Sequence, residues 1–364
     1  MEKAKINAGQ LFVLILLFEL GSALLLPIAI EAKQDAWLAI LIGMAGGYLL
    51  FFVYHRLYQF YPDILPTEYA QRIMGKVFGR VIAFLYIIYF AYLAARVLRD
   101  FGEMLVTFFY TETPLFILNA LLMVVIVYTI RKGIEVLART GELLFVIIYL
   151  LAISGFILIV ASGSININNL KPVLEEGFWP VMKAVFTETW YIPFGEAIVF
   201  AMIFPYLNNP KKAKITGLLA LGLSSINLAL VMAINISVLG VNLTSRSQFP
   251  LLSTIQTIQV AEFLERLDVF FMIALTICAF FKISVYMYAA VTGTANLFHV
   301  KETSQLVYPI GIVILFLSII IASNFSEHFK EGLQVVPLVL HLPFQVIIPL
   351  LFLVIAFIKN RKKL

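Results

Sequence analysis

The chain has 364 residues, of which 62% are hydrophobic and only 13% are charged, and its mean hydropathy is +0.98. Soluble domains carry roughly 25% charged residues, so a water-exposed surface cannot be built from this composition. Cytosolic enzymes, nucleic-acid-binding proteins and disordered chains are thereby excluded. The formal net charge of +5 matters less than the positions of the basic residues along the chain.

Ten stretches of the chain are apolar, and most have about 20 residues, the length that an α-helix needs to cross a bilayer. A membrane β-barrel would instead show shorter segments of alternating polarity. We therefore predict an all-α integral membrane protein with ten transmembrane helices, surrounded by membrane lipids. The stretches are 9–31, 36–55, 80–109, 115–130, 142–161, 185–206, 214–240, 268–290, 306–323 and 335–358.

An even number of spans places both termini on one side of the membrane. In this arrangement most of the 26 lysine and arginine residues fall on the side of the termini, including those in 131–139, 211–214 and 359–363. Basic residues concentrate in cytoplasmic loops, so we expect the N-terminus and the C-terminus in the cytoplasm. No composition shift marks a second domain, and residues 1–364 are predicted to form one multi-pass bundle.

Glycine and proline interrupt the first and sixth stretches. Gly21 lies near the middle of the first, and Pro193 and Gly195 lie in the sixth. Interrupted helices at corresponding positions of two halves are typical of inverted-repeat transporters, which hold substrate at the repeat interface near the bilayer centre. We therefore predict two five-helix repeats, about 9–161 and 185–358, with broken helices one and six.

These interruptions predict the chemistry of a ligand site. A half-helix that begins after Gly21 would aim its positive end and unpaired N–H groups at a carboxylate, with the Ser22 hydroxyl as a further donor. Carbonyl groups freed around Gly195 would accept hydrogen bonds from an ammonium group, and Phe194 would shape the apolar part of the pocket. An amino acid or a similar zwitterion fits this pattern.

Three charged residues lie deep in apolar stretches, where each costs about 2.5 to 3.5 kcal/mol to insert. Glu19 and Glu196 lie beside the two interruptions. They are candidates for proton carriers or partners of a ligand ammonium group; alternatively, they cap broken helix ends. Lys282 is the only basic residue deep in a stretch. It needs a carboxylate partner such as Glu19 or a ligand carboxylate, unless its long side chain reaches the membrane surface.

Four more charged residues lie at the outer end of the third stretch. Arg96 with Asp100 and Arg99 with Glu103 are each spaced i,i+4. Such pairs neutralise themselves on one helix. The alternative is an outer gate that forms ion pairs between helices.

Catalytic and metal-binding patterns are missing from the sequence. The single cysteine, Cys278, and four scattered histidines provide neither a disulfide nor a spaced set of metal ligands. We found no arrangement of nucleophile, base and orienting group, and no phosphate-binding glycine loop. We expect no enzymatic activity, no bound metal and no cofactor.

Several motifs spread over the whole chain resemble one family. The most specific is the loop Ile167-Asn168-Asn169-Leu170-Lys171-Pro172-Val173-Leu174 with Gly177, because general permeases lack it. The others are Leu20-Gly21-Ser22-Ala23-Leu24-Leu25-Leu26-Pro27, Glu103-Met104 with Thr113-Pro114, Phe194-Gly195-Glu196 with Phe204-Pro205, and Tyr286-Met287-Tyr288-Ala289-Ala290. Together they resemble the B subunits of GerA-type nutrient germinant receptors of bacterial endospores, a branch of the amino acid-polyamine-organocation (APC) superfamily of permeases.

The resemblance implies a ten-helix LeuT-like fold in the inner membrane of the dormant spore. It also implies a sensor subunit that works with a germinant receptor A subunit and a lipoprotein C subunit. By likeness, the ligand pocket lies between spans one, three, six and eight, which matches Gly21 and Ser22, residues 93–97, Phe194, and Lys282 with Tyr286. Gly-Ser-Ala replaces the commoner Gly-x-Gly of the superfamily, and Lys282 stands where a small polar residue is usual.

Three functions remain open at this stage. The first is a nutrient sensor in which ligand binding shifts an equilibrium between bundle states. The second is a proton-coupled amino acid permease, with Glu19 or Glu196 as the proton site. The third is a scaffolding subunit that binds no ligand. Composition and spacing do not separate them.

Overall fold

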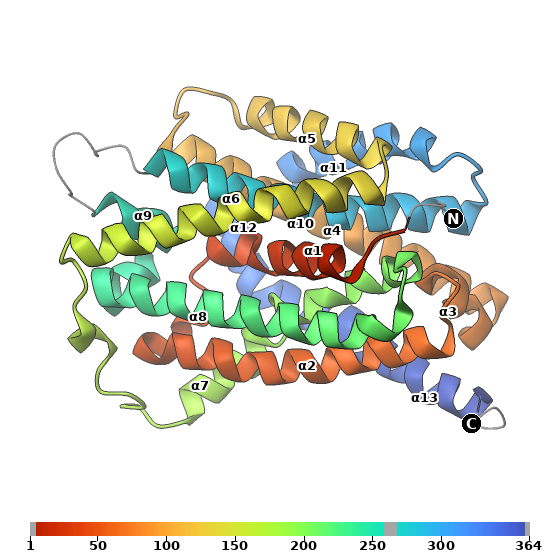
Figure 1. Ribbon diagram of the computed structural model, residues 1–364, viewed down its shortest axis with the longest axis horizontal. Helices are drawn as coiled ribbons and strands as arrows, with labels where there is room; N and C mark the ends of the chain where they lie inside the picture. Colours follow the sequence, from red (N-terminus) through yellow and green to blue (C-terminus); the bar gives the residue numbers. More distant parts are fainter. Residues whose placement is uncertain (1–4, 258–267, 361–364) are drawn as a thin grey trace.

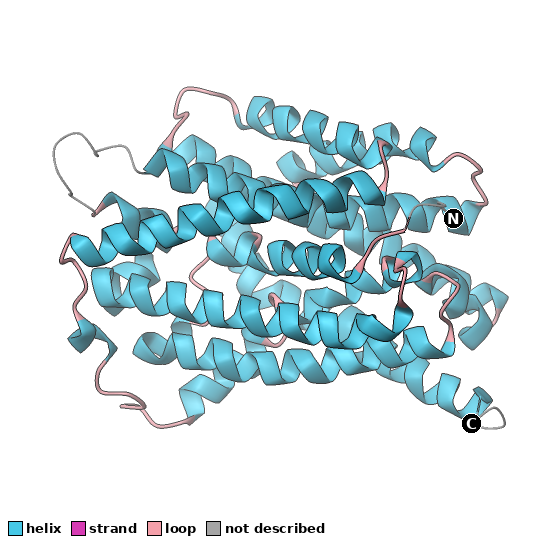
Figure 2. Cartoon of the chain, viewed as in Figure 1, coloured by secondary structure: helices cyan, strands magenta, loops and turns pink. Residues whose placement is uncertain are grey.

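A computed structural model describes residues 5–257 and 268–360 of the chain, and within these residues the secondary structure is helical, apart from one isolated bridge between Ile6 and Leu207 (Figure 2). The α-helices are α1 (Ala8–Leu20), α2 (Ala36–Phe60), α3 (Pro66–Met74), α4 (Lys76–Phe108), α5 (Leu115–Arg131), α6 (Ile134–Ala161), α7 (Trp179–Ala184), α8 (Ala213–Arg246), α9 (Pro250–Gln256), α10 (Asp268–Phe298), α11 (Val307–Ile320), α12 (Phe325–Lys330) and α13 (Ile348–Asn360). The prediction of an all-α fold is confirmed for the described residues.

Shorter 3-10 and π-helical segments connect or extend these helices. They are η1 (Ser22–Leu24), η2 (Ile30–Asp35), η3 (Ile167–Leu170), η4 (Val185–Thr189), η5 (Phe194–Met202), η6 (Phe204–Tyr206), η7 (Pro210–Lys212), η9 (Thr303–Leu306), η10 (Glu331–Val335) and η11 (Pro337–Ile347). Most of them lie next to glycine or proline, where the α-helical hydrogen-bond ladder is interrupted.

Seven helices in the described part are long and apolar enough to cross a bilayer. They coincide with seven of the ten predicted stretches: Ile30–Phe60, Lys76–Phe108, Ile134–Ala161, Pro210–Arg246, Asp268–Phe298, Thr303–Ile320 and Pro337–Asn360. Two further stretches correspond to the shorter apolar helices Ala8–Leu24 and Leu115–Arg131. The remaining stretch, 185–206, consists of η4, η5, η6 and the turns between them.

Helix α1 begins and ends at residues that determine its boundaries. Its first turn is closed by a capping box: the Asn7 side chain accepts from the Gln10 backbone at 2.8 Å, and the Asn7 backbone donates to the Gln10 side chain at 3.0 Å. It ends at Gly21, whose φ of −10° and ψ of −115° are not helical. Only the three-residue η1 follows, so the half-helix expected after Gly21 is a single short turn.

The interior of the molecule is built around α1, α4 and α10. Every residue from Val13 to Leu20 of α1 is buried, which a helix apolar on all sides requires. α1 packs against α6, α8 and α10, and α4 packs against α3, α10 and α11. The beginning of α1, the end of α13 and helix α3 lie at the same end of the bundle, on the right in Figure 1.

Candidate functional site

An ion pair buried between α10 and η5 forms the centre of the candidate site. The Lys282 side chain is fully buried, and its Nζ lies 2.5 Å from Oε2 of Glu196, which is also buried. The same ammonium group lies 5.1 Å from the centre of the Phe18 ring, at cation–π distance. Lys282 therefore does not reach the membrane surface. Its carboxylate partner is Glu196, whereas the sequence analysis had named Glu19 as an example of such a partner.

Two residues of the first span surround this pair. Glu19 is fully buried, and neither of its carboxylate oxygens has a hydrogen-bond partner within the described residues. It lies close enough to Lys282 and Glu196 to interact with both charges. Gly21 touches the stem of Lys282, because a Cβ atom at position 21 would lie 2.4 Å from Cδ of Lys282. The interruption of the first span thus gives Lys282 the space it occupies.

Tyr286 lies one helical turn after Lys282 on α10 and is fully buried. Its ring packs edge-to-face on Phe18 at 4.9 Å between centres and lies parallel to Phe90 at 6.3 Å. Its hydroxyl lies near the Glu196 carboxylate, outside the geometry of a hydrogen bond. Lys282, Tyr286 and Glu196 are therefore brought together.

Phe194 and Gly195 face other parts of the molecule. A Cβ atom at Gly47 of α2 would lie 2.4 Å from Cβ of Phe194, so this phenylalanine packs against α2. The carbonyl oxygen of Gly195 accepts a hydrogen bond of 3.2 Å from Tyr54, and its Cα faces the side chain of Gln345. Both residues therefore contact parts of the molecule other than the ion pair.

A small cavity of about 40 Å³ lies beside the pair, and Ser22 and Glu196 are the two predicted site residues that line it. Leu93 and Val97 of α4, from the stretch 93–97 that the resemblance named, also line it. A single water molecule needs about 10 to 15 Å³ of such space, so the cavity holds at most a few water molecules and no amino acid. The structure is therefore a closed state of this site.

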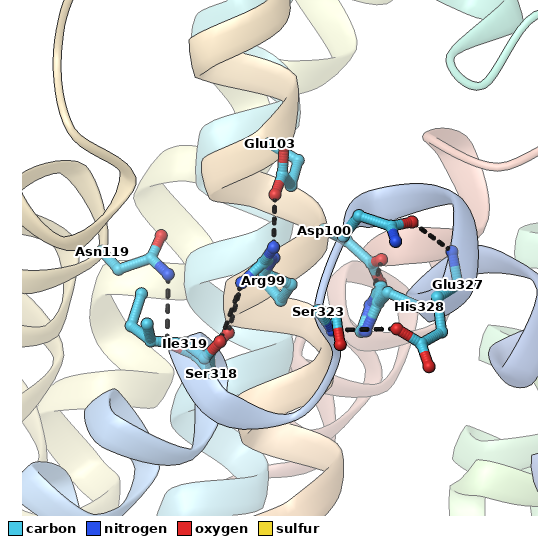
Figure 3. A network of polar contacts seen from close by, with 10 residues as sticks. Arg99, Asp100, Glu103, Asn119, Ser318, Ile319, Ser323, Glu327 and His328 are labelled. Atoms are coloured by element: carbon cyan, nitrogen blue, oxygen red, sulfur yellow. Dashed lines mark hydrogen bonds and ion pairs between the residues drawn. The ribbon is translucent and has the colours of Figure 1, made fainter.

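Arg96 and Asp100 line one side of the cavity, and both contact His328 of α12 behind them; we call these three residues the roof. Nε2 of His328 lies 2.9 Å from Oδ1 of Asp100, and the Arg96 guanidinium donates to the backbone carbonyl of His328. Figure 3 shows how Asp100 on α4 meets His328 on α12. The roof therefore joins two helices that are more than 200 residues apart in sequence.

The two i,i+4 pairs predicted on α4 have different outcomes. Arg99 pairs with Glu103 at 2.8 Å, as the single-helix interpretation predicts, and also donates to the Ile319 carbonyl at 3.1 Å (Figure 3). Among the ion pairs of the described residues, Arg96 and Asp100 do not pair with each other; both contact His328. Their contacts with His328 run between helices, and Arg96 also donates to the Tyr92 hydroxyl on its own helix at 3.2 Å.

The sequence analysis missed a third polar group, which lies on the last span. His341 lines the cavity, and its Nδ1 lies 2.7 Å from the hydroxyl of Tyr89, which also accepts from Gln345 at 2.9 Å. His341 and Gln345 are both buried. Two polar residues spaced i,i+4 in the apolar stretch 335–358 were the signal that they share an inward face.

Comparison with known proteins adds the family. The sequence of residues 5–326 matches the family described as "Spore germination protein". Spore germination protein KB of Bacillus subtilis (strain 168) is 58% identical over 363 residues, which cover 100% of this chain and 97% of that protein. Spore germination protein A2 of the same organism is 26% identical over 330 residues, 86% of each chain.

Two solved structures share the fold. MhsT, crystallised in complex with L-phenylalanine, matches with a TM-score of 0.68 at 12% identity, covering 98% of this chain and 99% of its own. Mhp1, a nucleobase-cation-symport-1 family transporter in a closed conformation with bromovinylhydantoin bound, matches with a TM-score of 0.69 at 13% identity, covering 100% of this chain and 80% of its own. These likenesses support the LeuT-like fold. The chain therefore belongs to the spore germination protein family, as its resemblance to the B subunits of GerA-type germinant receptors predicted.

Proposed function

We propose that this protein is the nutrient-binding B subunit of a spore germination receptor, and that the Lys282–Glu196 pair and the cavity beside it form the site for a small zwitterion. One observation carries the proposal: a buried cation and a buried anion meet where the first and sixth spans are interrupted, next to a second carboxylate without a hydrogen-bond partner in the described residues.

The ten-span topology with two repeats belongs to this proposal. In it, the seven long spans, the two shorter apolar helices and the segment 185–206 would each cross the membrane once, in two sets of five. The beginning of α1 and the end of α13 lie at one end of the bundle, as an even number of crossings requires. Arg131, Lys211 and Lys212 lie near membrane ends that this topology assigns to the cytoplasm.

Charge complementarity argues for an amino acid as the ligand. In the closed state the ammonium group of Lys282 and the carboxylate of Glu196 neutralise each other. A zwitterion that inserts between them would replace each partner with its own opposite charge: its carboxylate would take Lys282 and the Ser22 hydroxyl, and its ammonium group would take Glu196 and Glu19. Buried charges stay paired in both states, as a low-dielectric interior requires.

Binding must enlarge the cavity, since about 40 Å³ is too small for an amino acid. The segment 325–336, which includes α12 and η10, forms the movable side in this proposal. It contacts α4 through the roof, and Gly332 and Phe329 line the cavity. A ligand shifts such an equilibrium only if it binds the two states unequally. The shift would be passed to the A subunit and the lipoprotein C subunit in the spore inner membrane.

Glu19 supports the second candidate, a proton-coupled amino acid permease. A buried carboxylate without a hydrogen-bond partner within the described residues is a suitable proton carrier beside a substrate site. Uptake of a labelled amino acid into proteoliposomes separates the two functions. A sensor binds the amino acid without accumulating it, whereas a permease accumulates it when a proton gradient is applied and loses this coupling in Glu19→Gln.

Equilibrium binding of labelled amino acids to the purified subunit tests the site. Ser22→Ala removes a hydroxyl from the cavity wall, and a lost hydrogen bond of about 1 kcal/mol predicts about fivefold weaker binding. Ser284→Ala is the matched control, because Ser284 is a buried serine of α10 that is not part of the cavity wall. The proposal would be contradicted if the two variants bound the ligand with equal affinity, or if the subunit bound none of the amino acids tested.

A further inference from the structure

A polar hollow and an apolar groove meet at Arg131, and neither shares a lining residue with the cavity beside Lys282. The hollow measures about 320 Å³ and is lined by residues of α10 and of the segment 300–307. The groove measures about 340 Å³ and lies between α5 and α11, which pack against each other at the edge of the bundle in Figure 1. Arg131, the last residue of α5, lines both.

The charge of the hollow favours an anion. Its two charged lining residues are Arg131 and Lys301, and neither forms an ion pair within the described residues. Glu302, the adjacent carboxylate, does not line the hollow and accepts a hydrogen bond of 2.8 Å from Gln305. Two cations are thus held around one space that no acidic residue of the described part lines.

Uncharged donors complete the hollow. The span Thr303–Ile320 begins here, and Thr303 and Ser304 of its first turn line the hollow, so the positive end of an 18-residue helix faces the space. Thr292 of α10 also lines it; this side chain is 6% exposed, and its hydroxyl has no hydrogen-bond partner within the described residues. A phosphate group would supply acceptors for all of these donors.

The groove has the opposite character. It is lined by apolar side chains of α5 and α11, including Val124, Val127 and Ile312. At its floor, Gly311 lets α5 and α11 approach closely, because a Cβ atom there would lie 2.7 Å from Cγ2 of Val127. The outward faces of both helices are apolar and exposed, as at Val124 and Ile312, and face lipid in a membrane. The groove therefore fits a hydrocarbon chain.

We propose that an anionic phospholipid binds here, with its phosphate in the hollow between Arg131 and Lys301 and one acyl chain in the groove between α5 and α11. Arg131 is placed for this role at the junction. Its guanidinium lies 4.8 Å above the Tyr308 ring and donates to the Tyr308 hydroxyl, which leaves other N–H groups for a phosphate. Basic pockets between spans at the cytoplasmic surface bind the headgroups of anionic lipids in this way.

Native mass spectrometry of the full chain, purified in mild detergent with phosphatidylglycerol or phosphatidylcholine, tests the proposal. The wild-type protein should retain phosphatidylglycerol in preference to phosphatidylcholine. The double variant Arg131→Gln/Lys301→Gln should bind phosphatidylglycerol about 30-fold more weakly, since each basic residue near an anionic surface contributes about one kcal/mol of attraction. Lys212→Gln, which removes a lysine outside both the hollow and the groove, should retain it.

A second pair of variants tests the acyl chain. Ala120→Phe fills the groove, whereas Leu121→Phe changes the neighbouring, exposed position outside it. The first variant should lose phosphatidylglycerol and the second should keep it. Both variants should be equally well folded. Labelling of the buried Cys278 by a thiol-reactive dye on heating measures this. The proposal would be overturned if the protein retained the two lipids equally, or if Lys212→Gln lost as much phosphatidylglycerol as the double variant. It would also be overturned if inorganic phosphate alone protected Cys278 from labelling on heating as well as phosphatidylglycerol does.

Discussion

Two of the three buried polar groups around the cavity, the Lys282–Glu196 pair and the roof, differ in how they are held. Lys282 and Glu196 belong to segments that pack deep in the bundle, and the lysine is fully buried. The roof connects α4 to α12, a six-residue helix, and two of its contacts end on His328. The first group is fixed by its surroundings, whereas the second holds a short segment in place.

This difference assigns separate roles to the two groups. Breaking a fully buried ion pair leaves a charge without compensation, so the pair must remain matched in every state of the protein. Polar contacts to a short segment can be exchanged for water at lower cost. We therefore expect the pair to determine stability and ligand charge, and the roof to determine access.

Lys282→Met should have the largest effect. It removes the positive charge and strands Glu196, which costs about 3 to 5 kcal/mol for a buried pair. Removing both charges in Lys282→Met/Glu196→Gln should restore much of the lost stability, while ligand binding stays abolished. The buried Cys278, the single cysteine of the chain, provides the measurement, since a thiol-reactive dye labels it when heating unfolds the protein. A double variant less stable than the single would contradict the pairing.

Gly21→Ala should have the next largest effect, because the new Cβ would lie 2.4 Å from Cδ of Lys282. The lysine must move away from Glu196, and forced overpacking costs about 1 to 3 kcal/mol. Gly141→Ala is the control: there the nearest atom is a methyl carbon of Val13 at 3.3 Å. Binding affinity and the temperature of Cys278 labelling should fall at position 21 and change little at position 141. Equal responses would separate Gly21 from the site.

The sequence predicted the parts of the site that depend on composition, and missed those that depend on packing. Lys282 and Glu196 were visible because charges in apolar stretches are costly. Their pairing was not, because Glu19 and Glu196 flank equivalent interruptions and only the packing of α10 on η5 selects one. For Phe194, sequence cannot tell which side of an interrupted span faces the cavity, and the structure turns it toward α2.

The i,i+4 rule on α4 shows the same limit. It predicts the Arg99–Glu103 pair, since both partners lie on one helix. It fails for Arg96 and Asp100, because α12 brings His328 close enough to bind both. Local spacing predicts the same pairing for both sets of residues. The residue that makes them differ, His328, lies 228 residues beyond Asp100 in the sequence.

His328→Ala should have the smallest effect on stability and a distinct effect on access. It removes the imidazole from Asp100, and a lost hydrogen bond to a charged group costs about 1.5 to 3 kcal/mol when the partner stays buried. Water that enters the opened roof compensates part of this loss, so the net change should be smaller than for Lys282→Met. Association and dissociation of ligand should both become faster, with less change in affinity.

Glu103→Gln is the control for the roof, because it breaks an ion pair on the same helix that holds no segment of α12. This largely buried pair contributes to stability, but it does not hold α12, so ligand kinetics should stay unchanged. Stopped-flow measurement of ligand-induced tryptophan fluorescence compares the two variants, and Trp190 in the sixth span is a suitable reporter. If both variants alter the rates equally, or neither does, α12 is not the segment that admits the ligand, and the difference between the two buried groups has no functional meaning.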